Sequence, residues 1–345
     1  MTSEEKIIKM KYIVTEAIKK FGNKKIKFGV DKVERKSTGS VHFDFLLNGG
    51  FEPGTQAFYF GKNSSGKTSM CLRNIAEAQR RGDSCAWLRV EKGCNREYME
   101  NVGVDVDNLL IIENLPNGEA YMDLLIKLVE EEVDMIVVDS VSALIPKREM
   151  DDPLEKEHPG LQAKLITRTL GKVNAANKTS IVIFVSQVRE EFNSMGYTKF
   201  KHAGGRAAEH YGDYIVEFKI KDRLDDERKE VGSNVLKTEN RNDITGVNML
   251  MYTHKCRRGL AHKVGEMYFN FETGKIDDIG ELVRVAIKLK VFTHDGGWIT
   301  LSDELSTRFN LKSNKIRHSA LKELVNDDLE IQNLIKSKIE EHYEA

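Results

Sequence analysis

The sequence predicts an α/β fold in which a mostly parallel central sheet is covered by helices on both faces. Short apolar runs rich in β-branched residues alternate with segments of helical length from residue 55 onward. A glycine-rich loop joins the first of these runs to a helical segment. Parallel strands that are buried on both faces have near-continuous hydrophobic sequences, because helices cover both sides of such a sheet.

An amphipathic helix is predicted at residues 4–21. Ile7, Met10, Val14, Ala17, Ile18 and Phe21 recur near helical spacing, and Gly22 follows as a stop signal. The polar, basic stretch that follows has no clear period and predicts a connector. Periodicity alone leaves two sites for this helix, a neighbouring subunit or the core of its own domain. We expect residues 1–35 to be an N-terminal oligomerisation helix and linker.

The central part of the chain, residues 36–280, predicts the sheet itself. Residues 214–220, 247–255 and 266–271 lie close together without helices between them, which predicts antiparallel strands that extend the sheet. After about Asp278 the chain is polar and helical around one strand-like run, GGWITL, so residues 281–345 predict a small C-terminal α+β domain. The five expected parallel strands are QAFYF (56–60), CAWLRV (85–90), LLIIE (109–113), MIVVD (135–139) and IVIFVS (181–186).

Composition limits the class of protein. Of 345 residues, 40% are hydrophobic and 31% charged, enough for a sizeable core and against wholesale disorder. The net charge of -1 gives no global attraction to nucleic acid, so any basic surface must be local. The N-terminus is charged from its third residue, unlike a signal peptide, and no apolar run approaches the ~20 residues of a membrane span. The four cysteines (Cys71, Cys85, Cys94, Cys256) lack the paired spacing of a zinc site. We expect a cytoplasmic protein without a membrane partner.

Residues 61–68 match G-x-x-x-x-G-K-T, the pattern of a loop that cradles phosphates, and lie between a strand and a helix as that loop requires. Backbone N–H groups and the helix N-terminus are expected to point at the phosphates. Lys67 would supply a cation to the β- and γ-phosphates, and the Thr68 hydroxyl would ligate Mg²⁺. The candidate nucleotide-binding residues here are Gly61, Lys62, Asn63, Ser64, Ser65, Gly66, Lys67, Thr68 and Ser69.

Three polar residues at the ends of other expected strands complete this candidate site. Asp139 follows an apolar strand one sheet interval after the loop, which is typical of a second, metal-facing carboxylate. Glu91 is placed to orient or deprotonate the attacking water, although a solvated loop glutamate would have the same pattern. Gln187 ends a further strand, and its amide is a candidate sensor of the γ-phosphate.

Together these motifs resemble the RecA recombinase family, and within it a divergent strand-exchange protein of the kind that phages encode. The resemblance covers roughly residues 5–285 and is more specific than the phosphate loop alone, which many unrelated ATPases share. The similar stretches are STGSVHFDFLLNGGFEPG (37–54), GKNSSGKT (61–68), GVDVDNLLI (103–111), MIVVDSVSALIPKRE (135–149), IFVSQVRE (183–190) and HAGGRAAEHYGD (202–213).

The resemblance implies an ATP- and Mg²⁺-dependent filament on single-stranded DNA that pairs it with double-stranded DNA, with ATP at subunit interfaces. Single-strand-binding and loader proteins are the partners it suggests, and the compartment is the cytoplasm, that of the host for a phage protein. Glu91 falls on the catalytic glutamate of the family and Gln187 on its γ-phosphate-sensing glutamine. Tyr98 matches an aromatic residue that stacks on adenine, whereas Asn95 replaces its aspartate companion.

Two loops are expected to bind DNA. Residues 189–206 interleave cations with aromatic rings, and such loops neutralise phosphates while flat side chains stack on bases. An ordinary surface loop with incidental aromatics is the alternative. Residues 148–164 match the first DNA-binding loop of the family but are unusually acidic. The candidate DNA-binding residues are Lys164, Arg189, Phe192, Tyr197, Lys199, Phe200, Lys201, Gly204, Gly205 and Arg206.

The family carries basic residues near residues 253–266 that reach the γ-phosphate of the neighbouring subunit. Lys255, Arg257 and Arg258 are the candidates, and a solvated basic turn is the alternative. The chain departs from the family at Lys62 and Asn63 in the phosphate loop and at Arg89, where an acidic residue is common. Its C-terminal end also lacks a long acidic tail.

Three functions remain to be compared. The leading prediction is an ATP-hydrolysing recombinase that pairs homologous DNA. A non-catalytic regulatory relative would bind ATP and a protein partner, but the intact set of Lys67, Glu91 and Gln187 argues against it. A hexameric helicase shares the same core, yet only ~50 residues precede the phosphate loop here, where such helicases usually carry a separate N-terminal domain.

Overall fold

A computed structural model of the chain describes residues 2–21, 34–91, 93–153, 155–156, 158–192, 198–202, 205–225, 230–231, 244–257, 259–270, 273–311 and 313–344. The chain divides into two units, residues 1–34 and 35–345. In the first unit, helix α1 (Ser3–Phe21) confirms the predicted N-terminal helix. Glu4 and Glu5 in its first turn and Lys19 and Lys20 in its last turn complement the helix dipole.

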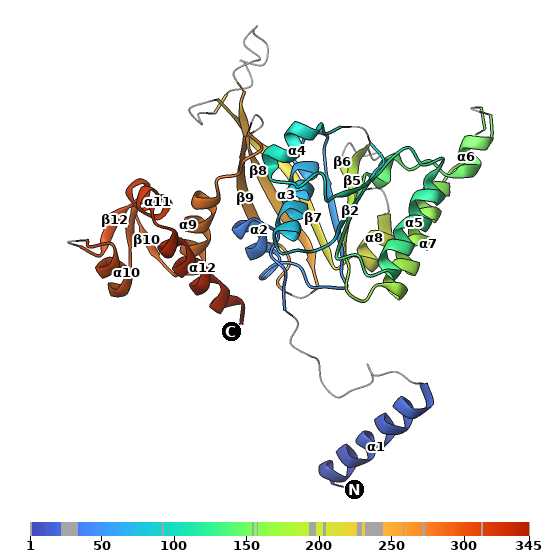
Figure 1. Cartoon of the computed structure of the whole chain (residues 1–345), viewed down its shortest axis with the longest axis horizontal. Helices are drawn as coiled ribbons and strands as arrows, with labels where there is room; N and C mark the ends of the chain where they lie inside the picture. The colour runs from blue at the N-terminus through green and yellow to red at the C-terminus, as the bar shows by residue number, and fades with distance from the viewer. Residues whose placement is uncertain are drawn as a thin grey trace. The chain divides into compact units, whose positions relative to one another are not determined.

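A large sheet forms the centre of the second unit (Figure 1). Its strands are β1 (Gln56–Gly61), β2 (Cys85–Arg89), β3 (Leu110–Ile112), β4 (Met135–Asp139), β5 (Ile181–Phe192), β6 (Thr198–His202), β7 (Tyr214–Leu224), β8 (Gly246–Cys256) and β9 (Val264–Asn270). They lie in the order β3-β2-β4-β5-β1-β7-β8-β9, and β6 pairs with β5. Neighbours from β3 to β7 are parallel, whereas β8 and β9 add antiparallel pairings.

Helices cover both faces of this sheet, as the continuous apolar strands predict. Along β1, Tyr59 belongs to the core cluster on one face, and Phe58 and Phe60 to the cluster on the other. This alternation follows from the two-residue period of a strand. The first face carries α2 (Val41–Leu46), α3 (Lys67–Arg80) and α4 (Arg96–Val102), and the second carries α5 (Gly118–Glu130), α7 (Leu161–Ala176) and α8 (Gly205–Tyr211).

Two details differ from the sequence prediction. The first of the three late strands, β7, pairs in parallel with β1 and is antiparallel only to β8. Gln187 does not end its strand, because β5 continues to Phe192 and pairs with β6 in antiparallel register. Gln187 is instead the last β5 residue opposite β1, where it pairs with Gly61. Beyond that point the chain leaves the main sheet as a two-stranded ribbon.

The C-terminal part of the chain has its own apolar core, built from residues such as Phe292, Ile299 and Ile335. A three-stranded antiparallel sheet replaces the single strand expected there. Helix α9 spans position 280, and the predicted domain bounds stay predictions. The elements are α9 (Asp278–Lys288), β10 (Thr293–Asp295), β11 (Trp298–Thr300), α10 (Asp303–Arg308), β12 (Lys315–Arg317), α11 (His318–Asp327) and α12 (Leu329–Glu344).

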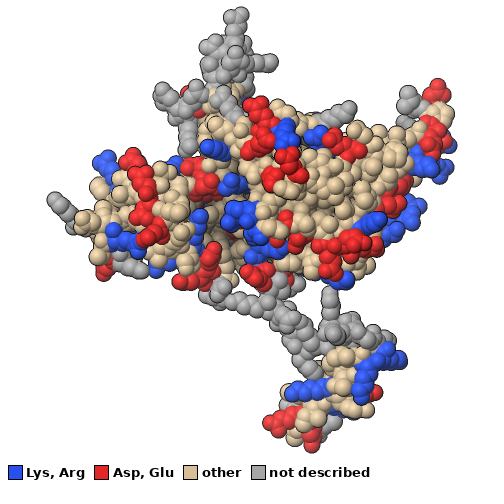
Figure 2. Space-filling view, in the orientation of Figure 1, with Lys and Arg blue, Asp and Glu red and all other residues tan. Residues whose placement is uncertain are grey.

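Among the described residues, no helix is long and apolar enough to cross a membrane. Charged side chains of both signs are interspersed over the face shown in Figure 2. This distribution agrees with the near-zero net charge of the chain and gives no single-signed field on that face.

Candidate active site and nucleic-acid interface

The glycine-rich loop connects β1 to the N-terminus of α3, with Gly66 as the N-cap residue. Lys67 is buried, and its ammonium Nζ donates to the carbonyl oxygens of Gly61 at 2.9 Å and Lys62 at 2.7 Å. The lysine therefore lies folded across the loop. Burial lowers the pKa of Lys67, while the Asp139 and Glu91 carboxylates act in the opposite direction. An anion in the loop would favour the charged lysine, because a nearby negative charge offsets the loss of hydration on burial.

Two glycines of the loop have no room for a side chain. Gly66 has φ +89°, a left-handed conformation, and a Cβ there would collide with the Met249 sulfur on β8. A Cβ at Gly61 would collide with the Phe218 carbonyl oxygen on β7. The loop can lie this close to the sheet only because both positions are glycine. Its tip, Lys62, Asn63 and Ser64, is exposed, whereas Ser65 is buried.

The candidate magnesium ligands meet as the spacing predicts. Thr68 lies in the first turn of α3, and its hydroxyl Oγ1 donates to Asp139 Oδ2 at 2.7 Å. Asp139, the last residue of β4, is buried, and burial raises the pKa of its carboxyl to about 6 despite the Thr68 hydrogen bond. A hydroxyl and a carboxylate beside a phosphate loop fit Mg²⁺, which prefers oxygen ligands and one or two protein carboxylates together with substrate phosphates.

Glu91 lies two residues beyond β2 and faces residues from two neighbouring strands. Its carboxylate accepts hydrogen bonds from the Ser140 hydroxyl and from the Gln187 side-chain amide, the latter at 3.2 Å. The backbone N–H groups of Val90 and Glu91 both donate to the Asp139 carbonyl, at 2.8 and 3.1 Å. The structure thus brings together the three polar residues that the sequence placed at separate strand ends.

Two serines complete this arrangement and were not predicted. Ser140 bonds Glu91, and Ser142 Oγ accepts the backbone N–H of Gln187 at 2.9 Å. Both follow Asp139 directly in the segment DSVS. The only signal in the sequence was the position of these two hydroxyls, one and three residues after Asp139. That spacing does not predict a contact with Glu91 or Gln187 unless the order of strands in the sheet is known.

A second part of the site lies at α4. Asn95 caps this helix by accepting the Tyr98 backbone N–H, and the Tyr98 hydroxyl lies 2.7 Å from the Ser69 hydroxyl on α3. Burial raises the pKa of Tyr98 to about 12, so the phenol stays neutral. Tyr98 is therefore held against the helix that follows the phosphate loop, at the border of the candidate nucleotide site.

The candidate DNA-binding residues fall into two groups. Residues 189–192 and 198–202 form the β5–β6 ribbon. In its backbone register Arg189 lies opposite Lys201, and Glu191 lies opposite Lys199. The ribbon also contains Phe192 and Phe200, Gly205 begins α8, and Arg206 is exposed on that helix. Tyr197 and Gly204 lie outside the described residues. In the first loop, Gly160 has φ +80° and precedes α7, on which Lys164 is exposed.

Two of the three candidate cations that follow β8 are described. Lys255 Nζ donates to the Glu209 carbonyl at 2.7 Å, near the C-terminus of α8. Arg257 forms an ion pair with Asp213 at 2.8 Å. Arg258 lies outside the described residues. Both described cations are bound within the protomer, so either would have to exchange these partners to contact a phosphate elsewhere.

Comparison with known proteins identifies the family. A family model described as the RecA N-terminal domain matches residues 6–246. The chain is 31% identical to protein RecA of Wolinella succinogenes over 317 residues, which cover 90% of this chain and 83% of that protein. It is 33% identical to protein RecA of Campylobacter hominis over 281 residues, 80% of this chain and 76% of that protein. The chain belongs to the RecA family.

A solved structure agrees with this assignment at the level of the fold. The crystal structure of the RadB recombinase covers 70% of this chain and 99% of its own, with a TM-score of 0.50 and 20% sequence identity. As a RecA-family member, the chain is an ATP-dependent recombinase of DNA recombination and repair and a DNA-dependent ATPase. The family uses nucleotide with Mg²⁺ and acts on DNA as oligomers. The two RecA relatives come from Wolinella succinogenes and Campylobacter hominis, and a phage origin stays a prediction.

Proposed function

We propose that this RecA-family protein binds Mg·ATP at the loop of residues 61–69 and assembles into a filament on single-stranded DNA, where it exchanges strands with a homologous duplex. One observation carries the proposal. Lys67, Thr68 with Asp139, and Glu91 with Gln187 meet at one edge of the main sheet, where β1, β2 and β4 end and β5 leaves the sheet. Ligands of open α/β sheets bind at this edge.

Each residue has a role that follows from its contacts. Lys67 would leave the loop carbonyls and pair with the β- and γ-phosphates, where its charge stabilises the transferring group. Thr68 and Asp139 would hold Mg²⁺, which neutralises phosphate charge when it is bound. The loop amides and Ser69 would complete the phosphate contacts, and Tyr98 would pack on the base.

Glu91 is the proposed general base. A carboxylate that accepts a hydroxyl and an amide hydrogen bond is oriented, and it needs one free lone pair to take a proton from water. Gln187 supplies one of these donors through its side-chain amide. In the proposed cycle the amide turns from Glu91 to the γ-phosphate, which releases the carboxylate for the attacking water.

The position of Gln187 also supports a connection to DNA. The same strand, β5, contains Gln187 at the nucleotide edge and Arg189 and Phe192 in the ribbon. A shift of Gln187 toward the γ-phosphate would move the strand that carries the proposed DNA contacts. Because such coupling is reciprocal, DNA on the ribbon would favour the ATP-bound arrangement to the same extent.

Filament formation is proposed to use α1. This helix carries the exposed apolar residues Ile7, Ile8, Met10 and Ile13, which suit docking on another protomer. Lys255, Arg257 and Arg258 remain the candidate cations for reaching the ATP of the neighbouring protomer. Single-strand-binding and loader proteins, and a cytoplasmic location, remain part of the proposal.

Electron microscopy with ATP and single-stranded DNA tests the assembly, and a strand-exchange assay tests the reaction. Helical filaments with strand exchange support the proposal. Closed rings would favour the hexameric helicase, and nucleotide binding without either assembly would favour a regulatory relative. Either of these two results would refute the proposed function.

A further inference from the structure

Arg89, the last residue of β2, uses both terminal guanidinium nitrogens in hydrogen bonds, whereas its buried Nε has no partner. One guanidinium nitrogen donates to both carboxylate oxygens of Glu113 at 2.8 Å, and another donates to the Cys94 carbonyl at 3.0 Å. The guanidinium carbon also lies 5.7 Å from the centre of the Trp87 ring. Its side chain is 18% exposed and that of Glu113 is 31% exposed.

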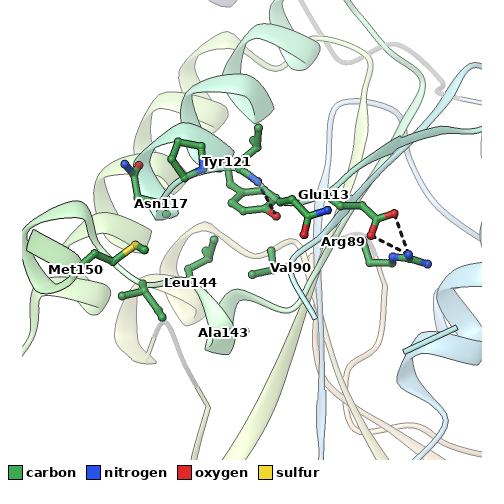
Figure 3. A pocket seen from close by; sticks show the side chains of 13 residues that line it. Arg89, Val90, Glu113, Asn117, Tyr121, Ala143, Leu144 and Met150 are labelled. Atoms are coloured by element: carbon green, nitrogen blue, oxygen red, sulfur yellow. Dashed lines mark hydrogen bonds and ion pairs between the residues drawn. The ribbon is translucent and has the colours of Figure 1, made fainter. Parts of the chain in front are cut away.

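Figure 3 shows the pair at the border of a pocket of about 200 Å³, with Glu113 directed toward the Arg89 guanidinium. Glu113 follows β3 directly, so it is fixed to the edge strand next to β2. Arg89 is fixed by its own strand, opposite Asp139 in the β2–β4 register. The two charged groups thus form a rigid support at the carboxyl edge of the sheet.

The segment after Arg89 is held at two points. Near its start, the N–H groups of Val90 and Glu91 donate to the Asp139 carbonyl. At its far end, the Cys94 carbonyl accepts the Arg89 guanidinium, immediately before the Asn95 cap of α4. Glu91 lies at the first of these points, and Arg89 holds the chain three residues beyond it. The orientation of its carboxylate therefore depends on where Arg89 holds residue 94.

Arginine suits these contacts because its planar guanidinium holds two nitrogens in a fixed arrangement. One nitrogen faces the Glu113 carboxylate and the other faces the Cys94 carbonyl. A lysine would keep the charge and could pair with Glu113, but its single ammonium lacks this fixed geometry. Replacement by lysine should therefore keep the ion pair with Glu113 but lose the hydrogen bond to the Cys94 carbonyl.

We infer that Arg89, supported by Glu113, is a positioning residue for Glu91: it holds the chain at Cys94, three residues beyond Glu91, so that the carboxylate faces the phosphate loop. This inference rests on the proposed role of Glu91 as the general base. The competing explanation is that the Arg89–Glu113 pair only stabilises the short edge strand β3. A stabilising pair would change the amount of folded protein, whereas a positioning residue changes turnover through Glu91.

A double-mutant cycle on DNA-stimulated ATP hydrolysis separates the two explanations. In the wild-type background, Arg89→Lys is expected to lower kcat by roughly 10- to 100-fold, the scale of a misplacement of about 1 Å. In the Glu91→Gln background the same change should alter kcat by less than about 2-fold, because the positioned group is already absent. Equal effects in both backgrounds, or no effect in the wild type, would overturn the inference.

Arg96→Lys is the matched control. Arg96 also pairs with two carboxylates, Glu100 and Asp107, but its side chain is exposed on α4. It should leave kcat unchanged. If Arg89→Lys does not fold, Glu113→Gln replaces it in the same cycle, with the same non-additivity expected. If Glu91→Gln hydrolyses ATP like the wild type, the proposed role of Glu91 fails, irrespective of the result for Arg89.

Discussion

Glu281 of α9, which lies at the N-terminus of α2, should make stability depend on pH. It is fully buried in α9, its carboxylate accepts the Ser40 hydroxyl at 2.7 Å, and its second oxygen Oε1 has no hydrogen-bond partner. Burial raises the pKa of Glu281 from 4.5 to about 7, against the effect of the Ser40 bond. The folded protein thus holds this proton more tightly than the unfolded chain does, and stability falls as the pH rises from 4.5 through 7.

With those two pKa values, the carboxyl costs about 1 kcal/mol of unfolding free energy at pH 5 and about 3 kcal/mol at pH 8. Glu281→Gln removes this titration, so its stability relative to the wild type should rise by roughly 2 kcal/mol between pH 5 and pH 8. Any constant cost of the buried amide cancels in that comparison.

Urea denaturation of both proteins at the two pH values measures the difference. Glu323→Gln, an exposed change on α11, is the control and should have the same pH dependence as the wild type. Parallel pH dependence of Glu281→Gln and the wild type would refute the assignment of this titration to Glu281.

Three further predictions follow from the site. Glu91→Gln should bind ATP normally but hydrolyse it on the order of 10²-fold more slowly, as measured by nucleotide binding and single-turnover kinetics. Loss of ATP binding would contradict a role for Glu91 in the hydrolysis step alone. Changing Lys199 and Lys201 together to Ala should flatten the slope of log affinity for single-stranded DNA against log salt by roughly 1.4. Phe200→Ala should instead weaken binding by ~1–3 kcal/mol and leave that slope unchanged. If salt titrations of both variants match the wild type, the DNA site lies elsewhere. Deleting residues 1–25 should give a folded protein, by circular dichroism, that no longer forms filaments in electron micrographs. A misfolded product would favour packing of this helix on its own domain.

The strands that carry the site were predictable because each is an uninterrupted apolar run. MIVVD is fully buried, and the carboxylate that ends it lies where a parallel sheet collects its polar ends. The phosphate loop was predictable from the spacing of its glycines, lysine and threonine. Two of these glycines are required because a Cβ would collide with the Met249 side chain or the Phe218 carbonyl oxygen.

What could not be predicted depends on the order of strands in space. The Arg89–Glu113 pair exists because β3 lies beside β2, and the Ser140–Glu91 contact exists because β4 lies on the other side of β2. No periodicity in the sequence encodes that order. The β5–β6 ribbon was expected as a loop because charged residues interrupt its apolar ones, so it lacks the continuous apolar run that marks the other strands.

Strand exchange between circular single-stranded DNA and a homologous linear duplex tests the central claim most directly. Wild-type protein with Mg²⁺ and ATP should convert the substrates to joint molecules and products. Lys67→Ala should hydrolyse no ATP and form no products, because the transferring phosphoryl group loses its principal cation. Efficient exchange by Lys67→Ala, or none by the wild type under conditions in which it hydrolyses ATP on DNA, would contradict the claim that this phosphate site drives recombination.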